Sequence, residues 1–310
     1  MDQNSSGTMK NQRLNCKQQA KRVKCPGQGV DVLMWHIVSD TSCDLHTLEG
    51  GEGVFDFATI PFTIRIGDHE YIDDENMPVN EMLTENENST ELAQTSCPSP
   101  EDWREKFAPE GPVVAFTISS ALSGSYNSAC TAKQMIQEEN PAKQIAVIDS
   151  KATGPEVAML VLKARELILE GKLFDEIETA LNREADRIHT VFALASYRNL
   201  IKAGRVSRLI GFIAGHLGFW GIGIGSDEGE ISIRGKARGD KSMIRFLVDE
   251  MKKVGAAGKE IFISHCLNEK CAEALKEQLE EAFRGVKVIL METRGLDSFY
   301  AERRGLIIGF

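Results

Sequence analysis

The spacing of apolar positions predicts alternating strands and helices in the first half of the chain. Short runs rich in β-branched and aromatic residues predict strands, and longer stretches with an apolar residue every three or four positions predict helices. The expected strands are Trp35–Ser39, Val54–Pro61, Phe62–Ile66, Glu70–Ile72, Pro112–Thr117 and Ile145–Ile148, and the expected helices are Pro100–Phe107, Ser125–Glu139 and about Gly154–Glu170. Such alternation is typical of a parallel sheet with helices on both faces.

The second half has a more mixed pattern. The expected helices are Phe174–Ile188, Tyr197–Ala203, Asp240–Val254 and Glu269–Phe283, and the expected strands are Val191–Ala195, Phe219–Gly225, Glu230–Arg234, Glu260–Ser264, Val286–Met291 and Leu306–Phe310. We therefore expect an α/β fold with two domains. A parallel three-layer α/β/α domain occupies residues 35–171, and a mixed-sheet α/β domain occupies residues 172–310.

Composition narrows the possible environments and partners. Residues 1–34 are polar and basic without an apolar period, so we expect a disordered extension. The formal net charge of −10 argues against a nucleic-acid partner and against adsorption to an anionic membrane. The seven cysteines follow no zinc-binding spacing and predict reduced thiols in the cytoplasm. We expect neither a metal nor a cofactor.

Hydroxyl side chains gather where the predicted strands of the first half end. Ser39–Ser42, Ser119–Ser125 and Asp149–Ser150 each follow such a strand, and Thr95–Pro100 precedes a helix. The carboxyl ends of parallel strands meet at one edge of the sheet, where open α/β folds bind ligands. Hydroxyls and helix N-terminal amides together suit a small anion such as a carboxylate. The alternative is that these residues only cap helices.

Five stretches resemble the motifs of DegV proteins, in the same order and spacing. They are Ile37–Leu45, Thr95–Pro100, Ile118–Ala129, Val147–Lys151 and Leu200–Ser207. The likeness runs from about Trp35 to Lys241 and continues more weakly to the end of the chain. It implies a two-domain fold that binds a fatty acid, because DegV proteins include the fatty-acid-binding subunit of bacterial fatty acid kinase.

The resemblance also implies where the ligand lies. The carboxylate is expected at the domain junction, with Thr95 and Ser120 as donors, Ser96 and Ser119 as their neighbours, and Arg205 as a further candidate. The acyl chain is expected in the second domain along Leu209–Gly225, an apolar segment rich in glycine, where the candidate lining residues are Ile210, Gly218, Phe219 and Gly223. Glycine permits a ligand to approach closely, although a solid core is the alternative for this segment.

The stretch Arg294–Gly305 departs from the family pattern. DegV proteins usually carry a Gly-Thr-His-Thr-Gly-Pro-Gly loop here, and this stretch contains no histidine. A buried carboxylate needs a partner, and Arg294, Arg303 and Arg304 are the nearest cations in the sequence. Arginine stays protonated, so we expect a protein that binds fatty acid but presents it poorly to a kinase subunit. The alternative is that these arginines form a solvated turn.

The resulting expectation is a carrier of one long-chain fatty acid that is not itself an enzyme. Two alternatives remain open. Cys97, where the family has glutamine, would be the nucleophile of an acyl hydrolase or transferase if the helix N-terminus acidifies its thiol. The protein would otherwise bind a different carboxylate ligand. The sequence predicts neither the acyl length, nor the oligomeric state, nor whether a kinase subunit phosphorylates the ligand.

Overall fold

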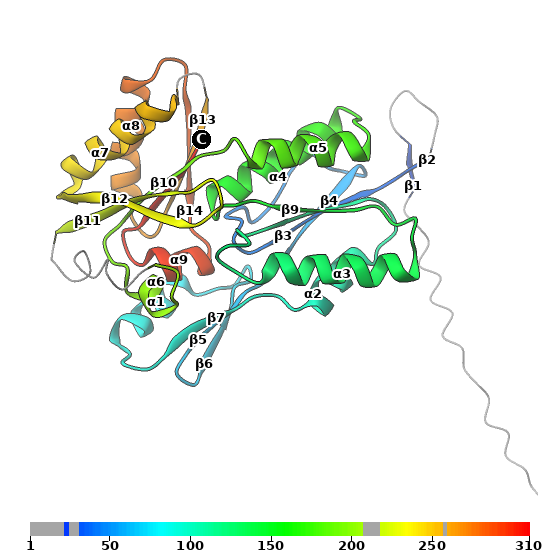
Figure 1. The fold of residues 1–310 in the computed structure, drawn as a ribbon, viewed down its shortest axis with the longest axis horizontal. Coiled ribbons are helices and arrows are strands. Elements are labelled where there is room, and N and C mark those ends of the chain that lie inside the picture. Colours follow the sequence, from blue (N-terminus) through cyan, green and yellow to red (C-terminus); the bar gives the residue numbers. More distant parts are fainter. Residues whose placement is uncertain (1–21, 25–30, 207–217, 257–258) are drawn as a thin grey trace, which may run out of the picture.

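A four-stranded parallel sheet forms the centre of the first half, in a computed structural model that describes residues 22–24, 31–206, 218–256 and 259–310 (Figure 1). Its strand order is β4-β3-β8-β9. The strands are β3 (Trp35–Asp40), β4 (Phe55–Ile60), β8 (Val113–Thr117) and β9 (Ile145–Asp149). All three pairings are parallel, so the predicted parallel sheet is confirmed.

Helices cover both faces of this sheet (Figure 1). One face packs against α4 (Pro155–Leu169) and α5 (Phe174–Ala185), and the other against α2 (Pro100–Phe107) and α3 (Ser125–Glu139). The α5 helix follows Gly171, yet its apolar residues Ile177 and Leu181 lie in the core of the first sheet. The domain boundary near residue 171 therefore stays a prediction.

The second half contains a six-stranded mixed sheet with the order β12-β11-β10-β15-β13-β14. Its strands are β10 (Thr190–Leu194), β11 (Phe219–Gly225), β12 (Ile231–Arg238), β13 (Glu260–His265), β14 (Lys287–Glu292) and β15 (Leu306–Gly309). Only the β13–β14 pairing is parallel, which confirms the predicted mixed sheet. The helices α7 (Asp240–Val254) and α8 (Glu269–Ala282) pack on its outer face.

A small antiparallel sheet packs near the inner face of the mixed sheet. It has the order β6-β5-β7, and its strands are β5 (Thr63–Ile66), β6 (His69–Ile72) and β7 (Ala93–Ser96). The expected hairpin of β5 and β6 is present. The hydrophobic core beside this small sheet also contains residues of three helices, α1 (Val79–Asn88), α6 (Arg198–Lys202) and α9 (Gly295–Ala301).

Some elements differ from the expectation. The sequence pattern did not predict α1, β7 or α9, because the first two are mostly polar and α9 has only seven residues. No structure was expected for residues 1–34, where β1 (Arg22–Lys24) and β2 (Asp31–Leu33) form an antiparallel pair. Strands of three residues are too short to produce a visible apolar period.

Successive residues of β11 alternate between the two faces of the mixed sheet. Trp220 and Ile222 belong to the core beneath α7 and α8. The intervening positions are Gly221, Gly223 and Gly225, which lie on the opposite, inner face because successive residues of a strand alternate. The glycines allow side chains of the neighbouring strand β10 to cover this face. The ring of Phe192 lies over Gly223, and Thr190 lies beside Gly225.

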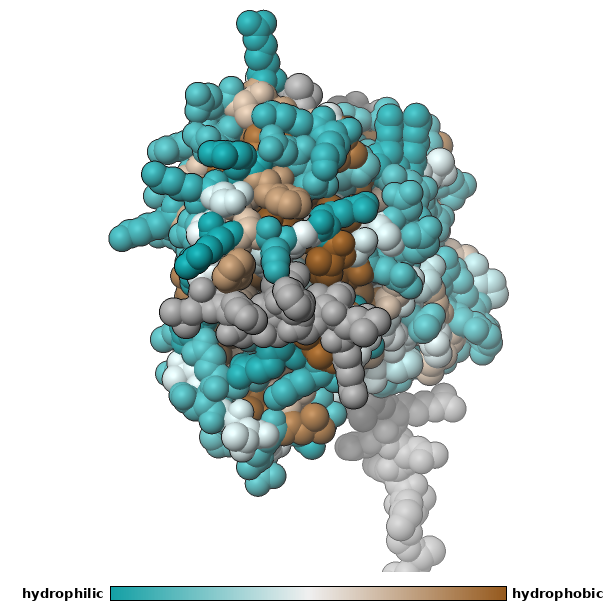
Figure 2. All heavy atoms as spheres, turned by 60° about the vertical axis from the view of Figure 1, so that its left-hand side comes forward, coloured by the Kyte–Doolittle hydropathy of each residue, from teal (hydrophilic) through white to brown (hydrophobic). Residues whose placement is uncertain are grey.

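The surface gives no sign of a membrane span in the described residues. None of the helices there combines the length and apolar composition that crossing a bilayer requires. Figure 2 shows one face covered mostly by hydrophilic residues, with small groups of hydrophobic side chains exposed among them.

Candidate functional site

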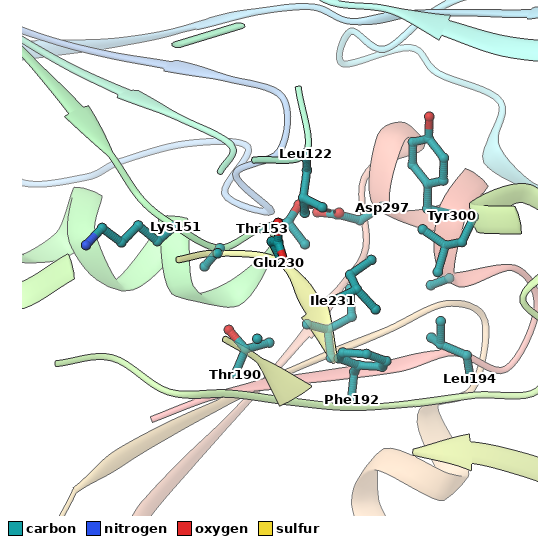
Figure 3. A pocket seen from close by; sticks show the side chains of 16 residues that line it. Leu122, Lys151, Thr153, Thr190, Phe192, Leu194, Glu230, Ile231, Asp297 and Tyr300 are labelled. Atoms are coloured by element: carbon teal, nitrogen blue, oxygen red, sulfur yellow. Dashed lines mark hydrogen bonds between the residues drawn. The ribbon is translucent and has the colours of Figure 1, made fainter. Parts of the chain in front are cut away.

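An apolar cavity lies between the inner face of the mixed sheet and the loops that follow β8 and β9 (Figure 3). Its volume is about 70 Å³. The lining residues come from both halves of the chain: Leu122, Lys151, Ala152, Thr153, Thr190, Phe192, Leu194, Leu200, Gly225, Gly229, Glu230, Ile231, Asp297, Tyr300, Ala301 and Ile307.

The walls of the cavity suit a hydrocarbon chain. Figure 3 shows Phe192, Leu194 and Ile231 on the mixed sheet, across the cavity from Leu122. The amine of Lys151 points away and pairs with Asp186 at 2.6 Å. These lining residues were not among those expected from the sequence, although alternate apolar residues along β10 and β12 indicate such a wall.

A pair of hydroxyl groups lies next to this cavity. The Tyr300 side chain of α9 lines the cavity, and its hydroxyl is 2.8 Å from the hydroxyl of Thr95 on β7. Thr95 is one of the two donors expected for a head group. Its neighbour Ser96 is exposed. Tyr300 was not among the expected ligand residues.

Ser119 and Ser120 differ in their surroundings. The buried Ser119 hydroxyl donates to the Gly229 carbonyl at 2.8 Å, which ties the β11–β12 turn to the first half of the chain. A β-carbon on Gly229 would lie 2.2 Å from that hydroxyl oxygen, so only glycine permits the contact. The Ser120 side chain is exposed, and its backbone N–H donates to Asp149.

Comparison with known proteins decides the family. The model of the family described as "Uncharacterised protein, DegV family" matches residues 34–302. The chain belongs to the DegV family. A DegV domain-containing protein of Streptococcus pneumoniae is 36% identical over 278 residues, which cover 90% of this chain and 99% of that protein.

Two solved DegV-family structures show the same fold. The fatty acid kinase B3 protein of Streptococcus pneumoniae, loaded with linoleic acid, has a TM-score of 0.87 and 36% identity, and the match covers 90% of this chain and 99% of that one. A DegV family protein of Eubacterium eligens, loaded with heptadecanoic acid, has a TM-score of 0.84 and 33% identity, with 89% and 98% covered.

The three arginines of the stretch that departs from the DegV pattern all contact protein groups. The buried Arg294 guanidinium donates to the carbonyls of Leu45 and Asp73, both at 3.2 Å. Arg303 pairs with Glu87 of α1 at 2.8 Å, and Arg304 pairs with Asp240 of α7 at 2.7 Å. None of the three lines the cavity. Their role as ligand residues stays a prediction.

The other expected ligand residues are scattered. The Arg205 side chain is exposed. Burial raises the pKa of Tyr300, and the positive charge of Arg205 acts in the opposite direction. Ile210 lies outside the described residues. Gly218 has a φ of +81°, and no atom of the described residues lies within 4 Å of a β-carbon built on it. Phe219 lies beneath the Arg238 guanidinium. A β-carbon on Gly223 would lie 2.3 Å from the ring of Phe192, which lines the cavity.

The alternative site at Cys97 finds little support in its surroundings. The Cys97 side chain is partly buried and packs near Leu122 and Tyr300. His265 is buried and accepts a hydrogen bond at Nδ1 from the Asn268 backbone. In the described part of the chain, no group of histidine, cysteine and acidic residues is arranged to hold a metal ion.

Buried carboxyl groups hold α9 against the first half of the DegV fold. Asp73 accepts hydrogen bonds from the backbone N–H groups of Gly295 and Leu296, at 2.8 and 2.9 Å. Asp44 accepts one from the Arg294 N–H at 2.8 Å. These amides begin a helix and have no partner within it, so the two aspartates complete the N-terminus of α9.

The same region contains carboxyl oxygens without hydrogen-bond partners in the described residues. They are one oxygen each of Asp44 and Asp297 and both oxygens of Glu156. Burial raises the pKa of Asp44 to about 7 and that of Glu156 to about 8, and it raises the pKa of Asp297 well above its ordinary value. Glu156 therefore keeps its proton at neutral pH, because a buried charge without a partner is costly.

The Glu156 proton makes stability depend on pH. The unfolded chain releases this proton near the ordinary pKa of 4.5, whereas the folded protein releases it near 8. The folded state binds more protons between these values, so the free energy of unfolding falls as pH rises through this window. One such proton contributes up to about 1.4 kcal/mol per pH unit.

We therefore predict that Glu156→Gln removes a large part of the pH dependence between about pH 5 and 8. Urea denaturation at several pH values measures it. Glu166→Gln is the matched control, because Glu166 is exposed on the same helix. An unchanged slope in Glu156→Gln would contradict the assignment of a buried, protonated carboxyl.

Proposed function

We propose that this protein is a carrier that binds one long-chain fatty acid. The acyl chain occupies the cavity on the inner face of the mixed sheet, and the carboxylate lies at its rim near Thr95 and Ser120. The supporting observation is an apolar cavity, formed by both halves of the chain, with a hydroxyl pair beside it. The similar DegV proteins loaded with linoleic and heptadecanoic acid support the same ligand class.

The energetics favour a ligand with a long apolar tail. Each methylene removed from water contributes about 0.8 kcal/mol, so most of the affinity comes from the acyl chain. Hydrogen bonds from hydroxyl groups contribute less and orient the head group. The described lining includes no cysteine or histidine and no serine, so we propose a carrier without catalytic activity of its own. The five described cysteines are free thiols, which supports a reducing compartment such as the cytoplasm.

The first prediction of this proposal concerns the bound lipid. Protein purified from a bacterial host is expected to retain fatty acid at close to one molecule per chain. Native mass spectrometry gives the stoichiometry, and extraction followed by mass spectrometry identifies the lipid. Recovery of no lipid, together with no uptake of added fatty acid, would contradict the proposed function.

The second prediction concerns the position of the acyl chain. Ile231→Trp places a larger side chain in the cavity and is expected to lower fatty acid occupancy at least about tenfold, since it displaces several methylenes. Ile233→Trp is the matched control. Ile233 is partly buried in the same cluster and lies two residues along the same strand, but it does not line the cavity. Equal binding by both variants would place the chain elsewhere.

We also propose that a fatty acid kinase subunit is the partner of this carrier. Because the Arg294–Gly305 stretch lacks the family histidine, we expect slow phosphorylation of the bound acid. The phosphorylation rate is compared with that of acid bound to the Streptococcus pneumoniae B3 protein under identical conditions. We expect a rate at least about tenfold lower for this protein, because a hydrogen bond to a charged group is lost. Equal rates would contradict the prediction.

A further inference from the structure

Thr95 and Tyr300 together have two hydroxyl protons, and the hydrogen bond between them uses only one. The two oxygens lie 2.8 Å apart, and either hydroxyl is able to donate to the other. One donated proton satisfies this bond, so the second hydroxyl proton needs another acceptor. Within the described part of the chain, neither hydroxyl makes a further hydrogen bond. The pair therefore offers a donor at the edge of an apolar cavity.

The position of the Tyr300 ring is set by the packing around it. The ring meets Phe299 in an edge-to-face contact at 5.0 Å between centroids. It also packs near Phe62, Ile118 and Leu296, which form a small buried cluster. The backbone of α9 is held at its N-terminus by Asp44 and Asp73. A donor fixed in this way loses little entropy when it binds a ligand.

The phenol also differs chemically from the arginines expected at this site. Burial raises the pKa of Tyr300, so its hydroxyl stays protonated and neutral near neutral pH. A neutral donor bonds more strongly to a carboxylate than to an uncharged oxygen, because the ionised acceptor strengthens the hydrogen bond. The pair therefore favours an acid over an alcohol without a buried positive charge.

We propose that Thr95 and Tyr300 form a two-hydroxyl clamp on the ligand head group, and that Tyr300 determines the preference of this chain for a carboxylate over an uncharged head. This inference rests on the proposed function. Tyr300 then has the role in binding the carboxylate that the sequence predicts for Arg294, Arg303 and Arg304. Arg294 instead donates to the backbone carbonyl of Asp73, while Arg303 pairs with Glu87 and Arg304 pairs with Asp240.

The test compares binding of linoleic acid and linoleyl alcohol, which share the same tail. Tyr300→Phe keeps the ring and removes only the hydroxyl. Affinity for the acid is expected to fall about 10- to 100-fold, as for loss of a hydrogen bond to a charged group, and affinity for the alcohol by less than about tenfold. The preference for the acid over the alcohol therefore decreases.

Tyr197→Phe is the matched control. Tyr197 is fully buried in the neighbouring cluster, and its hydroxyl has no partner in the described residues. This variant is expected to leave the affinity for both ligands, and their ratio, unchanged. Thr95→Val is expected to resemble Tyr300→Phe. The double variant should bind only slightly more weakly than either single variant, because both remove the same clamp.

The outcomes separate the clamp from the carrier function. If the wild type binds linoleic acid and Tyr300→Phe binds it within twofold, the clamp is overturned while the carrier function stands. Equal losses for the acid and the alcohol would also overturn it, because they indicate a change in cavity shape. Absence of binding by the wild type would overturn the carrier function and the clamp together. The clamp is supported if Tyr300→Phe loses affinity selectively for the acid and Tyr197→Phe does not.

Discussion

The contact between α9 and two buried aspartates organises the site. A helix N-terminus leaves backbone amides without partners, and here the carboxylates of Asp44 and Asp73 bind them. Asp44 follows β3 and Asp73 follows β6, so this contact joins the C-terminal stretch to two separate loops of the first half. It fixes α9 between the sheets. Asp297 and Tyr300, one helical turn apart, then both line the cavity.

This arrangement places several acidic groups close together away from water. A β-carbon on Gly154 would lie 2.9 Å from an oxygen of Asp44 and 3.3 Å from one of Asp297, so both carboxyls face this glycine. Protons on part of the cluster and the guanidinium of Arg294 lower the repulsion. Arg294 therefore has a clear structural role within the fold.

Most of the fold could be predicted from the sequence, because apolar periodicity and the DegV motifs span both halves of the chain. The sequence also named Thr95, whose hydroxyl contacts that of the cavity-lining Tyr300, and the role of Thr95 in binding stays a prediction. It did not predict α9, whose seven residues show no period, or the contact of Thr95 with Tyr300, which joins residues 205 positions apart. Arg294, Arg303 and Arg304 were expected to bind the carboxylate only because of their positive charge. Sequence does not show that α1 and α7 already provide acidic partners for Arg303 and Arg304.

The most direct measurement is a crystal structure of the protein with linoleic acid. We expect electron density for the acyl chain along Phe192 and Ile231, with the carboxylate within hydrogen-bond distance of Tyr300 or Thr95. Density for the acid in another part of the molecule, with this cavity empty, would show that the cavity is not the fatty acid site.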